Sequence, residues 1–211
     1  MKHPSTRGLY AYWNERRGTR PAPERNDIDP VGIRHQLGDT FMLAADFVDT
    51  LRFRLAGTRV CALFGRELKG EAFAELWDED GRKAIGDLMA VVDHEQVGAV
   101  AGLTGRAADG SEADLEMLLL PLAHSGHARI RALGILVPTE PVYWLGEKPV
   151  TELVLGALRH LGPNLESFDA PRFATASAPA ALSPPPAGAR VRHGFVVYSG
   201  GRETTSGDQT G

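Results

Sequence analysis

Cys61 is the only cysteine of the chain, and Arg59 precedes it by two positions. A cysteine in this setting can act as a nucleophile, attach a cofactor, or serve as a small core residue. The first two roles need a thiolate, which neighbouring cations favour. The sequence pairs Cys61 with no histidine base, and unpaired cysteine is among the residue types most often buried. We therefore expect Cys61 to line the core or a pocket.

Histidine pairs are the next candidates for chemistry, as metal ligands. His124 and His127 flank a Ser-Gly dipeptide, and glycine and serine at such a point favour a turn between strands. His94 is followed by a glutamate but lacks the second histidine of the zinc-protease helix pattern. We expect no metal site.

Carboxylates and phosphate-binding loops are the remaining candidates for chemistry. Asp27 and Asp29 could form a carboxylate pair, but Asp29 precedes Pro30, which is typical of a helix N-cap followed by a first-position proline. The glycines near 200 lack the lysine and spacing of a P-loop, and no Gly-x-Ser-x-Gly elbow occurs. No catalytic residue is expected, so we interpret the protein as a non-enzyme.

Composition narrows the possible partners. The 211 residues include 23 basic and 27 acidic side chains, a net charge of -4, and 43% are hydrophobic. This balance argues against nucleic acid and against an anionic membrane surface. The N-terminal stretch has no apolar core of a signal peptide, and the most apolar run, 117–123, is too short to span a membrane. We expect a cytoplasmic protein.

The hydrophobic pattern predicts one α+β domain. The predicted elements are an amphipathic helix over 7–17, a brief helix over 29–37, strands over 41–48 and 51–55, short helical pieces over 60–77, a longer helix over 80–93, and strands over 97–106, 113–122 and 128–137. Strands joined by hairpins around a cluster of helices indicate one antiparallel sheet with the helices on one face.

Beyond Pro138 the character of the chain changes. The stretch KPVTELVLGALRHLG predicts a short helix within a helical extension over 139–169. Residues 170–189 are rich in proline and alanine and predict a flexible linker. The closing RHGFVVYSGGRE, within 190–211, is strand-like: it is either part of a loose tail or a docking segment.

The stretch AGTRVCALFGRELKGEAFAELWDEDGR resembles the central part of PAS domains, and GRAADGSEADLEMLLLPL resembles their hairpin with an Asp-Gly turn. With LYAYWNERRGTRPAPERNDIDP and LEMLLLPL, it is similar to small single-PAS proteins common in alphaproteobacteria. The resemblance implies a five-stranded antiparallel sheet of order 2-1-5-4-3, with helices on one face. It places an N-terminal helical extension at 1–38 and the PAS domain at 39–138.

The resemblance also bears on cofactors. Flavin photosensors of this superfamily attach flavin to a cysteine at the position of Phe73 here, and the sequence departs from that motif. Haem-binding members use a histidine early in the long helix, where 83–87 has none and His94 is the only nearby option. The sequence therefore argues against a flavin adduct and against haem of the usual PAS types, and it identifies no other cofactor.

A PAS fold implies a space between sheet and helices. The residues expected to line it are Phe53, Leu55, Cys61, Phe64, Trp77, Leu88, Met89, Leu103, Leu118 and Leu133. Alternation in 51–55 assigns Phe53 and Leu55 to the inner face. On the later strands both faces are apolar, so the pattern leaves the face open. Trp77 either lines the pocket or caps it from outside.

Two functions remain open. In the first, the protein is a sensory or regulatory PAS protein, without an effector domain of its own, that binds a small apolar ligand. In the second, it is a ligand-free adaptor with a packed core. Either acts through protein contacts, as a homodimer or with an unidentified signalling protein. The candidate interface residues are Leu9, Tyr10, Tyr12 and Trp13, which either meet a partner or pack on the sheet.

Overall fold

The structure is a computed structural model that describes residues 1–46, 50–123, 131–161, 190–192 and 195–197. The chain divides into two compact units, 1–173 and 174–211. The first unit contains α1 (Pro4–Arg17), β1 (Thr40–Ala45), β2 (Leu51–Ala56), α2 (Thr58–Phe64), α3 (Glu79–Glu95), β3 (Gly98–Ala107), β4 (Glu112–Pro121), β5 (Arg131–Pro138) and β6 (Val150–Leu161), with short 3-10 helices at Arg25–Asp27, Leu37–Asp39 and Phe73–Leu76. The second contains β7 (Arg190–Arg192) and β8 (Phe195–Val197).

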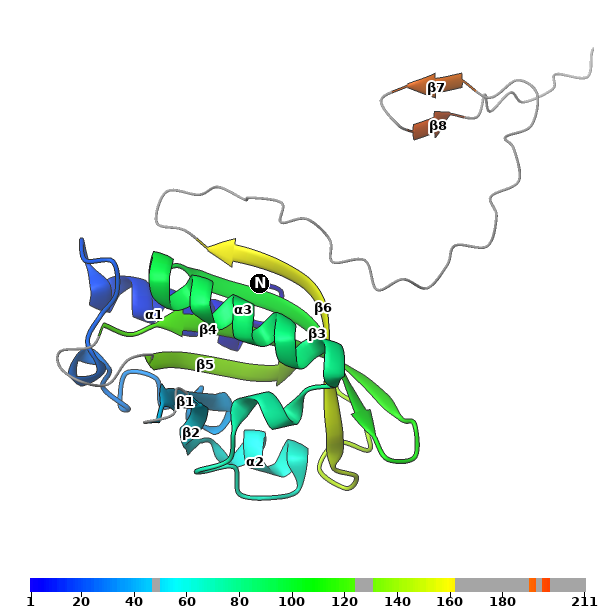
Figure 1. Cartoon of the computed structure of the whole chain (residues 1–211), viewed down its shortest axis with the longest axis horizontal. Helices are drawn as coiled ribbons and strands as arrows, with labels where there is room; N and C mark the ends of the chain where they lie inside the picture. The colour runs from blue at the N-terminus through cyan, green and yellow to red at the C-terminus, as the bar shows by residue number, and fades with distance from the viewer. Residues whose placement is uncertain (47–49, 124–130, 162–189, 193–194, 198–211) are drawn as a thin grey trace, which may run out of the picture. The chain divides into compact units, whose positions relative to one another are not determined.

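One antiparallel sheet organises the first unit. Its strand order is β2-β1-β5-β4-β3-β6, so the expected order 2-1-5-4-3 is confirmed and a sixth strand is added beside β3. Figure 1 shows α3 crossing one face of the sheet and α1 lying behind the other. We call the face that carries α2 and α3 the inner face, and the face that carries α1 the outer face.

The helix expected after residue 148 is wrong, because Val150–Leu161 forms strand β6. Its pairing with β3 shifts register twice. At the first shift Thr151 has no partner on β3, and at the second the three-residue step from Leu155 to Leu158 lies opposite a two-residue step on β3. Such bulges break the two-residue alternation of a strand. Apolar residues then recur at three-residue intervals, as they do on a helix.

The brief helix expected over 29–37 is also wrong: residues 30–36 form turns. Their backbone bonds span three residues, as in the 3.0 Å bond from Gly32 N to Asp29 O. The segment wraps around Tyr12, whose hydroxyl accepts a 2.8 Å hydrogen bond from Asp29 N. Asp29 still caps a turn, since its carboxylate accepts from Val31 N at 2.9 Å.

Each face of the sheet has its own core. On the inner face, the apolar stripe of α3 (Ile85, Leu88, Met89 and Val92) is buried as the pattern predicts. The carboxylate of Asp78 begins this helix by accepting from Gly81 N at 2.8 Å. On the outer face, Leu9 and Trp13 of α1 pack on the sheet, which is the second of the two roles expected for them.

The second unit supports one of the expectations about the C-terminal part. β7 and β8 pair antiparallel, so 195–197 is a strand as expected from its apolar run. The predicted linker over 170–189 lies outside the described residues. None of the described helices is both long and apolar enough to cross a membrane.

Candidate functional site

Four aromatic rings form a chain on the inner face. Phe41 comes from β1, Phe53 from β2, Phe73 from the 3-10 helix before α3, and Trp77 from the residue that follows that helix. Neighbouring centroids are 5.6 to 5.8 Å apart, from Phe41 to Phe53 and Phe73, from Phe53 to Phe73, and from Phe73 to Trp77. Most of these pairs meet edge to face, the arrangement that aromatic rings favour in cores. All four side chains are buried.

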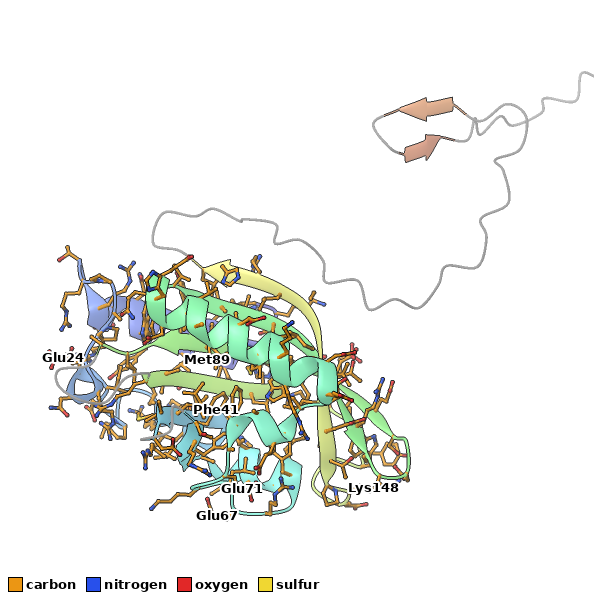
Figure 2. The ribbon with its side chains drawn as sticks, in the orientation of Figure 1. Glu24, Phe41, Glu67, Glu71, Met89 and Lys148 are labelled. Carbon is orange, nitrogen blue, oxygen red and sulfur yellow. The ribbon has the colours of Figure 1, made fainter. Side chains whose placement is uncertain are left out.

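Space for the first of these rings comes from β5. Its inner face carries Ala132 and Gly134, and Gly134 pairs with Phe41 across the sheet. A Cβ built at Gly134 would overlap the Phe41 ring, so this ring lies directly on the glycine backbone. Figure 2 shows Phe41 on the β1 side of this core and Met89 on α3. The small residues of β5 thus open a space that Phe41 fills.

Most of the expected lining residues lie in this inner core. Phe53, Phe64, Trp77, Leu88, Met89 and Leu103 are all buried there, and Cys61 packs against the core while remaining partly exposed. The sequence therefore indicates the right region between sheet and helices. Phe41, Phe73 and Gly134 belong to the same region but were missed. Nothing in the chain around them distinguishes inward from outward positions.

Leu55 is a wrong prediction, because 45% of its surface is exposed. Opposite the step from Met42 to Leu43, β2 passes from Leu55 to Phe53, so Arg54 is an extra residue. A bulge of this kind turns the following side chain to the other face. Leu55 therefore pairs with Met42, which packs toward the outer core.

Leu118 and Leu133 are wrong for a different reason. Both are fully buried, but they belong to the outer core with Leu9 and Trp13. β4 and β5 are covered on both faces, so their sequences lack the polar alternation that would identify the inner side.

Trp77 lies inside the core, not over its outside, and 1% of its surface is exposed. Its indole Nε1 has no hydrogen-bond partner among the described residues. A buried donor without an acceptor costs free energy, and this group is the polar feature of the aromatic cluster.

Cys61 lies at the rim of the inner core, on α2. Its Sγ is 3.6 Å from Glu67 Oε1 and 3.9 Å from Ala56 O, both acceptors. Burial raises the pKa of the thiol, and the carboxylates of Glu67 and Glu71 raise it further. Figure 2 shows both glutamates near α2.

Arg59 does not assist Cys61. Its guanidinium binds the Asp39 carboxylate in a two-point contact, with Nε–Oδ1 at 2.5 Å and Nη2–Oδ2 at 2.7 Å. This hydrogen bonding raises the pKa of Arg59. The cation that could have favoured a thiolate is therefore engaged by Asp39 instead. The arrangement suits a core residue and not a nucleophile.

The candidate interface residues of α1 are occupied by the fold itself. Leu9 and Trp13 are buried, and Trp13 Nε1 donates a 2.8 Å hydrogen bond to Pro121 O at the end of β4. Tyr10 stacks on Trp13 at 6.2 Å, and Tyr12 is half-buried against the 29–32 turn. Leu9 and Trp13 are therefore unavailable to a partner while α1 is docked.

A buried carboxylate holds the start of α1. Glu116 of β4 is 5% exposed and accepts hydrogen bonds from Lys2 N at 2.6 Å and His3 N at 3.0 Å. Burial alone would raise the pKa of Glu116, but these hydrogen bonds outweigh it, and the pKa is lowered from its ordinary 4.5. An anion beside the first turn also complements the helix dipole.

Two surface hollows were not predicted. One of about 380 Å³ lies between α3 and β6, and one of about 200 Å³ lies beside the Arg59–Asp39 pair and is lined also by Leu63, Leu136 and Leu145. Among the described residues, no three acidic, histidine or cysteine side chains could hold a metal ion together. His124 and His127 lie outside the described residues.

The chain belongs to the PAS domain family, whose sequence pattern matches residues 1–137. Solved structures that it resembles include a light-oxygen-voltage domain studied with a flavin analogue, at 12% identity and a TM-score of 0.41 over 51% of this chain and 82% of that one. Another is the PAS domain of a protein from Colwellia psychrerythraea, at 16% identity and a TM-score of 0.37 over 52% and 97%. No curated protein matches. The family membership indicates a sensory or regulatory role.

Proposed function

We propose that this protein is a regulatory PAS module with a packed interior, which acts in the cytoplasm through protein–protein contacts. It works as a homodimer and with an unidentified signalling partner. The observation that carries the proposal is the seating of the Phe41 ring on Gly134, within a buried chain of four rings. The space that a PAS fold offers a ligand holds side chains here.

A binding role agrees with the chemistry of the polar groups. Burial and nearby carboxylates raise the pKa of the Cys61 thiol, and Arg59 is engaged by Asp39. Glu116, the most deeply buried carboxylate among the described residues, accepts the backbone N–H groups of Lys2 and His3, directly before α1, and so acts structurally. These three ionisable groups support the fold rather than a reaction.

A second candidate, the sensing of a small apolar ligand, is favoured by Trp77. Its indole N–H is buried among apolar side chains with no acceptor in the part of the chain that the structure describes. A ligand with a carbonyl or ether oxygen would satisfy this donor. Binding would require the aromatic rings to move apart.

Native mass spectrometry of the full chain, purified without denaturation, distinguishes the two candidates. We expect the mass of the polypeptide, or of its dimer, with nothing added. Phe41→Ala is the matched positive control, because removal of the ring should leave an apolar cavity. Cavities of this kind bind benzene, so added benzene should increase the mass of the variant. A small molecule that co-purifies with the wild-type chain, and is lost from the variant Trp77→Phe, would instead establish ligand sensing.

A further inference from the structure

The two edges of the sheet differ in how they are covered. On β2, Phe53 N donates to Glu71 O at 3.0 Å and Phe53 O accepts from Gly70 N at 2.8 Å, so the 70–72 segment pairs with this edge. On β6, Asp78 N donates to Leu153 O at 3.1 Å. Beyond Leu153, none of the described residues pairs with the outer edge of β6, which runs on to Leu161. Figure 1 shows β6 at the margin of the sheet.

The open part of β6 contains a bulge but lacks other features that keep strand edges apart. Natural edge strands are commonly protected by charged residues, by proline, by bulges or by shortness. Residues 153–158 contain neither a charge nor a proline, and Gly156 and Ala157 are exposed at their centre. This stretch therefore presents backbone groups that another strand can pair with.

A hollow of about 380 Å³ accompanies this edge. Its apolar floor is formed by Leu88 and Val91 of α3 and by Leu155 and Leu158 of β6, and Asp80, Lys83 and Asp87 of α3 also line the hollow. His160 also lines it, and the buried Nδ1 of this residue has no hydrogen-bond partner among the described residues. A strand added to β6 would cover this apolar floor and bring polar groups toward His160.

We propose that the open edge of β6 pairs antiparallel with β6 of a second copy of this chain. This inference rests on the proposed homodimer and names its surface. The bulge at Gly156 and Ala157 brings Leu155 and Leu158 to the same inner side. A two-fold axis near Gly156 and Ala157 sets the leucines of one copy beside those of the other, so the contact is self-complementary.

Charge also selects the antiparallel arrangement. Glu152 and Arg159 flank residues 153–158, and both face the outer side, opposite Arg106 and Val100 of β3. Antiparallel pairing about this axis puts Glu152 of one copy diagonal to Arg159 of the other, within reach of a long side chain, twice per dimer. Parallel pairing in register would instead oppose like charges, which is unfavourable across strands.

Ala157 provides the test, because a residue beside the two-fold axis lies close to its own counterpart. In the full chain, Ala157→Lys brings two ammonium groups together, and we expect the dimer dissociation constant to rise at least about tenfold in analytical ultracentrifugation. Ala157→Glu should act alike. Mixing the two variants should restore a heterodimer of near wild-type affinity, which a misfolded variant could not do. Leu55→Lys, on the covered edge, is the matched control and should leave association unchanged.

Several results would overturn the assignment. A wild-type chain that stays monomeric at all accessible concentrations excludes the self-pairing, and so does a dimer that survives Ala157→Lys. Loss of the dimer on removal of residues 190–211 would assign the contact to that segment. A monomer that binds an extended apolar peptide at β6 would assign the edge to another protein. None of these results depends on whether the interior holds a ligand. The packed-core proposal is therefore tested separately, by native mass spectrometry.

Discussion

The ring of Phe41 lies directly on the backbone of Gly134, across neighbouring strands β1 and β5. This contact decides how the PAS interior is used. A glycine at the centre of a sheet usually weakens a strand, yet here it accepts a ring that continues into the aromatic chain. The pair therefore sets both the stability of the core and the space that is left for a ligand.

Gly134→Ala should destabilise the fold by about 1 to 3 kcal/mol, because the new methyl group overlaps the ring and overpacks the core. Urea unfolding followed by tryptophan fluorescence measures this change. Gly102→Ala is the matched control: its added Cβ would have no atom closer than 4.0 Å. A second change, Phe41→Leu, should relieve the overlap, so the double variant should be less unstable than the sum of the two single changes.

The antiparallel sheet and the stripe of α3 could be predicted because they depend on hairpin turns and on periodicity, whereas the strand order of β1 to β5 came from the resemblance to PAS domains. What failed has a common physical cause. The bulge at Arg54 turns Leu55 outward, and the bulges of β6 imitate a helix. A bulge arises from pairing with a partner strand, so one strand's sequence does not reveal it.

The face of a doubly covered strand is also invisible to single-sequence reasoning. Leu118 and Leu119 are both fully buried, one toward α1 and the other toward α3. Leu118 is buried because α1 docks on the outer face through Leu9 and Trp13. This docking is a contact between segments far apart in the sequence. Gly134 was missed for the same reason, since its role exists only with Phe41 above it.

Glu116→Gln should weaken the attachment of α1, because the charged hydrogen bonds to Lys2 N and His3 N become neutral ones. We expect a loss of about 1 to 3 kcal/mol. The folded pKa is depressed, so the stabilisation is present above the ordinary pKa of 4.5 and is lost as pH falls through the folded value. The difference in the free energy of unfolding between the two proteins should therefore shrink as pH falls below 4.5. Glu75→Gln, exposed in the 3-10 helix before α3, should leave the profile unchanged.

Trp13→Ala should cost about 3 to 5 kcal/mol, because it removes a large buried side chain between α1 and the outer face of the sheet. Trp13→Phe keeps most of the apolar contact and removes only the hydrogen bond to Pro121 O, so we expect about 0.5 to 1.5 kcal/mol. Thermal unfolding by circular dichroism compares the two. Equal losses in both variants would mean that the hydrogen bond, and not packing, holds the helix.

Cys61 should react slowly with thiol reagents, since burial and the carboxylates of Glu67 and Glu71 raise the pKa of its thiol. Only the thiolate reacts, so a raised pKa lowers the reactive fraction at neutral pH. The rate of modification by a chromogenic disulfide should therefore fall well below that of a free cysteine and increase steeply with pH.

Glu67 provides the means to separate charge from burial. Its Oε1 lies 3.6 Å from Sγ, so Glu67→Gln removes the nearest negative charge and leaves the shape of the site almost unchanged. We expect the pKa of Cys61 to fall and the modification rate at pH 7.5 to rise severalfold. Glu75→Gln, exposed in the 3-10 helix before α3, is the control and should not change the rate. An unchanged rate in Glu67→Gln would assign the slow reaction to burial alone. A wild-type rate equal to that of free cysteine would show that Cys61 is not a core residue and would reopen its assignment as a nucleophile.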